Sequence, residues 1–82
     1  MREQGHVVYV SPSYGMLVVR HSGGFALVEM LGDEGSIEVG DSVSGRWDAL
    51  GGEPIFKSEE AYDAYFQGNW GTKEAAIKVA NS

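Results

Sequence analysis

Two histidines, His6 and His21, carry the most versatile chemistry in this sequence, because a neutral imidazole binds transition metals and titrates near neutral pH. Each histidine lies at the end of an apolar run. If the two runs pair as antiparallel strands, a suitable register places the rings opposite each other, as a metal pair or a pH-sensitive contact would require. No third ligand is spaced to complete a metal site. The sequence therefore favours two surface histidines and predicts no bound metal.

Polar residues in turns offer two further groups that resemble catalytic pairs, Asp41 with Ser42 and Asp33 with Glu34. Neither group has a base or an oxyanion donor near it in the sequence. The paired glycines at residues 51–52 lack the strand-to-helix context of a phosphate-binding loop and are typical of a tight turn. We therefore expect a protein that is not an enzyme and uses no cofactor.

The length and composition limit the class of protein. The 82 residues predict one domain, residues 1–82, and the absence of cysteine excludes disulfides and thiolate-bound zinc. The polar start has no apolar segment of the kind found in a secretory signal, and no apolar run approaches the roughly 18 residues that span a bilayer. We expect a cytoplasmic protein without membrane contact.

Acidic residues are concentrated in the second part of the chain. Acids and cations balance in residues 1–31, so residues 32–82 supply the whole net charge of −6. Proteins that bind duplex nucleic acid neutralise phosphates with clustered lysine and arginine. The six scattered cations of this chain argue against such binding, whereas weaker binding of single strands by base stacking is still compatible with them.

Three short apolar runs, at residues 7–10, 16–19 and 25–31, are separated by turns rich in glycine and serine. This pattern predicts an antiparallel meander of three strands. Because successive side chains of a strand point to opposite faces, the second and third strands have two apolar faces. One face is expected to carry Leu17, Val19, Ala26, Val28 and Met30, and the other Met16, Val18, Arg20, Phe25, Leu27 and Glu29. Such a sheet must curl or be covered.

Shorter elements follow. Alternating residues predict a fourth strand at 42–48, and residues 55–57 predict a fifth strand after the turn at 51–52. Five short strands with glycine-rich turns indicate an all-β fold, a small five-stranded barrel whose closure removes exposed edges. Residues 58–82 are then a C-terminal extension packed on this barrel.

The extension contains two expected elements. Residues 59–67 could form a helix, but the alternation of Tyr62, Ala64 and Phe66 with other residues and the aromatic content favour an extra strand. Thr72 is a suitable N-cap, which predicts a short helix over residues 73–80.

Three segments carry a resemblance to a known family: Gly5-His-Val-Val-Tyr-Val, Tyr14-Gly-Met-Leu-Val-Val and Ala26-Leu-Val-Glu-Met. They resemble the opening of a cold-shock domain, which reads Gly-x-Val-Lys-Trp-Phe-Asn, Lys-Gly-Phe-Gly-Phe-Ile and Val-Phe-Val-His-Phe. The later Val39-Gly-Asp-Ser-Val is similar to the family's turn into the fourth strand. The resemblance covers about residues 5–57. It implies an oligonucleotide/oligosaccharide-binding (OB) barrel that stacks single-stranded bases on the face of its second and third strands.

This chain departs from the family at the stacking positions. Tyr9 keeps one aromatic platform where the family has tryptophan, whereas Met16, Val18 and Leu27 replace phenylalanines and Glu29 replaces a histidine. Stacking contributes about 1–3 kcal/mol per base and requires π faces. The face therefore keeps its apolar area and loses most of its stacking capacity.

Two functions follow as hypotheses. In the first, a non-enzymatic OB-barrel module binds single-stranded RNA or DNA through the face of strands one to three, as the fold's usual ligands favour. Its contact residues would be Tyr9, Tyr14, Met16, Val18, Arg20, Phe25, Leu27, Arg46 and Trp47. In the alternative, the C-terminal extension covers this face and the module recognises a protein partner. The covering residues would be Tyr62, Tyr65, Phe66, Trp70 and Ile77.

Overall fold

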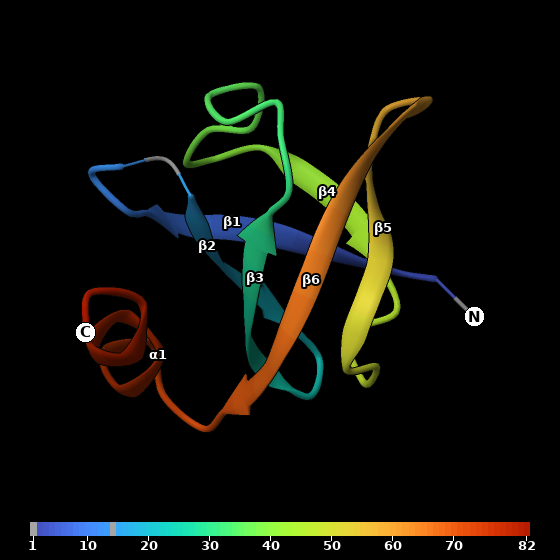
Figure 1. The fold of residues 1–82 in the computed structure, drawn as a ribbon. Helices are drawn as coiled ribbons and strands as arrows, with labels where there is room; N and C mark the ends of the chain where they lie inside the picture. The colour runs from blue at the N-terminus through green and yellow to red at the C-terminus, as the bar shows by residue number, and fades with distance from the viewer. Residues whose placement is uncertain (1, 14) are drawn as a thin grey trace.

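A closed barrel of six antiparallel strands followed by one C-terminal helix makes up the computed structural model, which describes residues 2–13 and 15–82 (Figure 1). Tyr14, one of the expected contact residues, lies outside the described residues. The elements are β1 (Glu3–Val10), β2 (Met16–His21), β3 (Gly24–Met30), β4 (Ser42–Gly45), β5 (Gly51–Lys57), β6 (Glu60–Trp70) and α1 (Lys73–Ala80).

The barrel wall runs in the order β1-β2-β3-β6-β5-β4, and β4 pairs with β1 to close it. The all-β class and the barrel are confirmed, but the expectation of five strands is wrong. β6 does not lie on a finished barrel as an extension. It pairs with β3 on one side and with β5 on the other, so without it both of those strands would have a free edge.

The expected alternation of side chains in the second and third strands is confirmed. The face that carries Leu17, Val19, Ala26, Val28 and Met30 is buried in the barrel interior, together with residues from the other strands. In β1, a register shift between Val7 and Tyr9 interrupts the alternation, so that Val7 packs inside while Val8 and Tyr9 both pack outside. This irregularity explains why β1 is apolar on both faces.

Side chains from two connections fill the barrel interior. Ile37, from the connection between β3 and β4, is buried and lines a hollow with Val10 at the end of β1. Trp47, from the connection between β4 and β5, is only 2% exposed and packs near Gly5 at the start of β1. The two side chains therefore enter the barrel from opposite ends.

The segment around Trp47 corrects two expectations from the sequence. β4 ends at Gly45, earlier than expected, because the chain turns there, and the N–H of Ala49 donates to the carbonyl of Arg46 over 2.9 Å. This turn directs the indole of Trp47 inwards. The expected turn at residues 51–52 is instead the start of β5.

The connection between β3 and β4 is fixed to the barrel by Lys57. Its Nζ lies 2.9 Å from the Oδ2 of Asp41 and donates to the carbonyl of Ser36 over 3.0 Å. The hydrogen bond from the backbone N–H of Glu38, followed by that from Lys57, lowers the pKa of Asp41. The hydrogen bond with Asp41 raises the pKa of Lys57. Both shifts favour the charged pair that holds this connection over the barrel end.

We expect the substitution Gly5→Ala to destabilise the barrel by about 1–3 kcal/mol, the usual cost of overpacking a core. A Cβ at Gly5 would lie 2.6 Å from the Cγ1 of Val19 and 3.0 Å from the carbonyl oxygen of Arg20. Gly52→Ala is the matched control, because a Cβ there meets no atom within 4 Å. Urea unfolding of both variants measures the difference, and equal midpoints would contradict the close packing at Gly5.

Candidate binding surface

Five of the residues expected to contact nucleic acid do lie together on the outer face of β1, β2 and β3, but the helix covers this face. Val18 and Leu27 are 0% and 1% exposed, and they form a buried cluster with Ala76 of α1. Figure 1 shows α1 beyond the end of β6, beside β2 and β3 and away from β5. The other members of the five, Tyr9, Met16 and Phe25, are partly buried around this cluster.

The helix forms where it does because both of its ends are fixed. Thr72 has extended backbone angles, and its hydroxyl accepts the N–H of Ala75 over 3.1 Å, so the expected N-cap and the helix over residues 73–80 are confirmed. At the other end, the hydroxyl of Tyr9 donates to the Oδ1 of Asn81 over 2.8 Å. The aromatic platform expected at Tyr9 therefore holds the end of the helix.

The covering segment differs from the expected one. Phe66 is buried in the barrel interior and Tyr62 packs against the same core, so the expected contacts of these two residues with the outer face are wrong. Trp70 and Ile77, both named in advance, pack on the outer cluster. β6 forms part of the barrel wall, so most of its residues cannot cover the outer face. The chain reaches that face only at the end of β6 and in α1.

The remaining expected contacts do not share one surface. Arg20 is exposed and lies opposite Phe25, at the edge of the covered face. Arg46 lies in the connection between β4 and β5, and its Nη1 is 3.9 Å from the Oε1 of Glu53. Trp47 is a core residue whose ring stacks on Phe66 with centroids 5.8 Å apart, and it packs in the barrel interior, away from the outer face of β1, β2 and β3.

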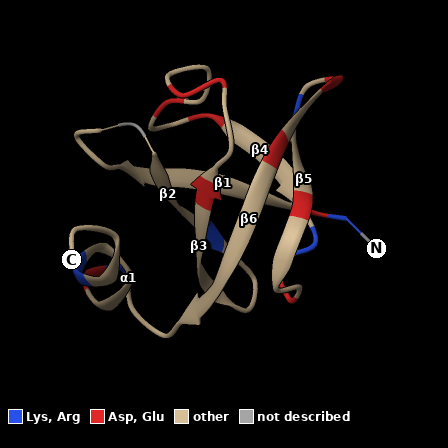
Figure 2. Cartoon of the chain, viewed as in Figure 1, with Lys and Arg blue, Asp and Glu red and all other residues tan. Residues whose placement is uncertain are grey.

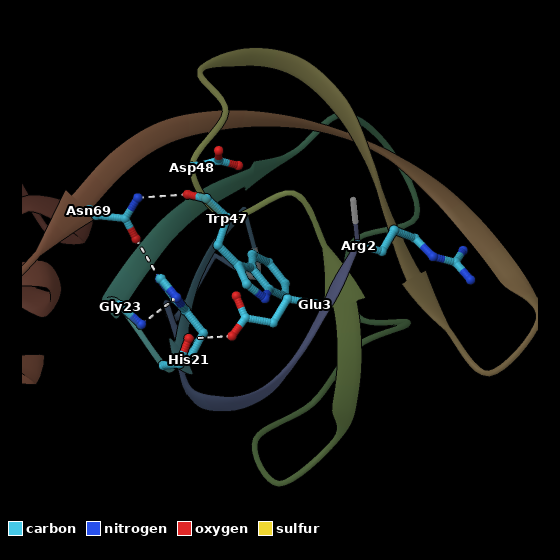
Figure 3. Close-up of a pocket in the computed structure, with 8 residues that line it drawn as sticks. Arg2, Glu3, His21, Gly23, Trp47, Asp48 and Asn69 are labelled. Carbon is cyan, nitrogen blue, oxygen red and sulfur yellow. Dashed lines mark hydrogen bonds between the residues drawn. The ribbon is translucent and has the colours of Figure 1, made fainter.

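One barrel end has a hollow of about 560 Å³ next to Trp47 (Figure 3). Some of its polar groups are hydrogen-bonded to one another. Asn69 donates to the carbonyl of Trp47 over 2.6 Å, and its Oδ1 lies 2.6 Å from the Nε2 of His21, whose Nδ1 accepts the N–H of Gly23. These bonds require the His21 proton on Nε2. The arrangement joins three segments at the barrel end.

The two histidines do not form a pair. His6 lies opposite Arg20 in the sheet, and its Nδ1 is 3.3 Å from the hydroxyl of Ser42, whereas His21 lies at the end of β2 beside Asn69. In the part of the chain that the structure describes, no three histidine, aspartate or glutamate side chains are grouped to hold a metal ion. The indole N–H of Trp47 is buried without a hydrogen-bond partner among the described residues.

A second outer surface, on β5 and β6, was not singled out from the sequence. Cross-strand pairing creates two rows of side chains on it. In one row Glu29, Tyr65 and Gly52 are neighbours, and in the next row Leu31 lies beside Asp63, which is opposite Pro54. We call these six residues the β5–β6 surface. Leu31 and Tyr65 are 51% and 45% exposed, and α1 does not cover them. Only the pairing of β3 with β6, which no local pattern reveals, brings them together.

Comparison of the chain with protein-family models, curated proteins and solved structures finds no match. The six-stranded closed barrel is compatible with small barrels such as the OB fold. Among residues 2–13 and 15–82, no helix is long and apolar enough to cross a membrane.

Proposed function

We propose that this protein is a non-enzymatic binding module that recognises a protein partner. The observation that carries the proposal is the burial of Val18 and Leu27 beneath Ala76 of α1. A single strand that stacked on this face would first have to displace the helix. Displacement would expose the apolar cluster to water, at about 25 cal/mol for each Å² uncovered.

Charge supports the same proposal. The chain carries a net charge of −6, and Arg20 lies exposed at the edge of the covered face. Binding of a single strand relies on a positively charged groove as well as on aromatic platforms. Two exposed large apolar side chains, Leu31 and Tyr65, instead lie on the β5–β6 surface, next to carboxylates that would repel phosphates. A surface of this kind suits a protein partner better than a nucleic acid.

The test combines an oligonucleotide titration with partner capture. Single-stranded deoxythymidine and uridine oligomers at low salt are expected to leave the amide signals of Tyr9, Met16 and Leu27 unchanged up to millimolar concentration. The intact protein, immobilised and incubated with a nuclease-treated native lysate, is expected to retain a protein. Shifts at those three amides, with loss of the α1 signals, would overturn the proposal in favour of nucleic-acid binding.

A further inference from the structure

We propose that the β5–β6 surface binds an extended, basic segment of a partner protein, with one apolar side chain of that segment seated beside Leu31. This inference rests on the proposed function and adds the surface and the chemistry of the partner. Three properties of the surface support it: an uncovered apolar centre, a hollow that can take a side chain, and an acidic surround.

The apolar centre is open because of the residue that faces Tyr65. Tyr65 of β6 lies opposite Gly52 of β5, and a Cβ at Gly52 would meet no atom within 4 Å. Cross-strand neighbours normally cover each other's side chains. Since glycine has no side chain, the ring of Tyr65 is uncovered on this side and provides a flat contact area.

The hollow lies at Gly52, the residue opposite Tyr65, and extends along the neighbouring row of the surface. It has a volume of about 250 Å³, and Leu31, Gly52, Pro54 and Asp63 contribute to its lining. The N–H of Leu31 donates to the carbonyl of Asp63 over 3.1 Å, which fixes the start of the β3–β4 connection against β6. The hollow is therefore built on two strands of the barrel wall, and its size suits a single aliphatic or proline side chain.

Acidic residues surround the apolar centre of the β5–β6 surface. Glu29 and Asp63 belong to the two rows of the surface, and Glu53 lies in β5 next to Pro54. Figure 2 shows acidic segments on the neighbouring strands β3, β6 and β5. Two nearby cations are already engaged, since Lys57 pairs with Asp41 and Arg46 lies near Glu53. Charge complementarity therefore favours an occupant with lysine or arginine on both sides of its apolar residue.

The same charges disfavour a second copy of this chain. A symmetric dimer through this surface would place the same patch of both copies in contact, and Asp63 and Glu29 would then face like charges. A basic segment from another protein meets no such repulsion. Binding of such a segment also leaves the barrel unchanged, because no strand or helix has to move.

The test selects binders from a displayed library of random linear peptides, with the intact protein as bait. We expect the selected peptides to carry lysine or arginine around an aliphatic, proline or aromatic residue. Their affinity should fall about tenfold in Leu31→Ser, Tyr65→Ser and Asp63→Lys, and should weaken as salt is raised. Val39→Ser is the matched control, because Val39 is 61% exposed and lies outside the surface. Dispersed amide spectra verify that each variant is folded.

Each alternative outcome has a distinct meaning. Three results would overturn this inference: selected peptides that lack basic residues, peptides that bind equally well to Tyr65→Ser, or no enriched peptide at all. None of them would contradict recognition of a protein elsewhere on the barrel. Concentration-dependent broadening of the Gly52 and Tyr65 signals without peptide would identify a second copy as the occupant, and would also overturn it. Binding of oligonucleotides at Tyr9 and Leu27 would instead remove the proposed function itself.

Discussion

Replacing Trp47 by alanine is expected to lower the free energy of unfolding by about 3–5 kcal/mol, the range for large aromatic side chains removed from a core. The indole is 2% exposed and stacks on both Phe66 and His21, with ring centroids 5.8 Å apart in each case. Its six-membered ring lies against Gly5 and Gly45, where no side chain could move in to fill the space. A domain of this size has a total stability of roughly 4–12 kcal/mol, so the variant should lose at least about a quarter of it.

Urea unfolding followed by far-UV circular dichroism measures this loss. Leu50→Ala is the matched control, because Leu50 lies in the same connection and is 72% exposed, and exposed substitutions of this kind usually change stability by less than about 0.5 kcal/mol. A second variant, Trp47→Phe, should lose less free energy of unfolding than Trp47→Ala, because its smaller ring can still stack. A loss below about 1 kcal/mol in Trp47→Ala would contradict the placement of the indole inside the barrel.

The first half of the fold could be predicted from the sequence because its signals are local. The alternation at Leu17, Val18 and Val19 predicts that Val18 faces away from its two neighbours, and the structure confirms this division. Thr72 likewise predicts the start of α1, because an N-cap depends only on residues three positions away. Patterns of this kind are decided within one strand or one helical turn, and the rest of the chain does not change them.

The strand count and the site depend on long-range pairing, which no local pattern reveals. Residues 59–67 alternate as a strand does, but only the pairing of Glu29 with Tyr65 and of Gly52 with Tyr65 makes β6 part of the wall. Trp47 follows two alternating residues, a pattern that predicts a strand, whereas the turn after Gly45 directs it inwards. The resemblance to cold-shock domains ends at about residue 57, so it gives no information on what covers the outer face of β1, β2 and β3.

The covering of this face also explains its composition. An exposed stacking surface requires flat rings, but a helix packs closely only on side chains that interdigitate with its own. Val18 and Leu27 fit beneath the small Ala76, where a phenylalanine would hold the helix away. The aliphatic residues at these positions therefore agree with a face that is closed by the protein's own chain.

Introducing a lysine at Ala76 should release α1 from the barrel. Ala76 is 0% exposed and lies against Val18 and Leu27, so a longer, charged side chain has neither space nor a partner there. Overpacking alone costs about 1–3 kcal/mol, and burial of an unpaired charge adds to it. An isolated helix of eight residues is not stable in water. We therefore expect residues 73–80 to unfold as the helix leaves, while the six strands stay paired.

Amide hydrogen exchange and dye binding are two independent measurements of the release of α1. In Ala76→Lys, the amides of α1 should exchange rapidly and the exposed apolar face should bind anilinonaphthalene sulfonate, whereas the amides of β5 and β6 should stay protected. Val79→Lys is the matched control, because it adds the same charge to the same helix at a residue that is 39% exposed, near the C-terminal end, where a cation is favourable. If Ala76→Lys behaved like Val79→Lys, the helix would not be closing the face, and the main argument against single-strand binding would be lost.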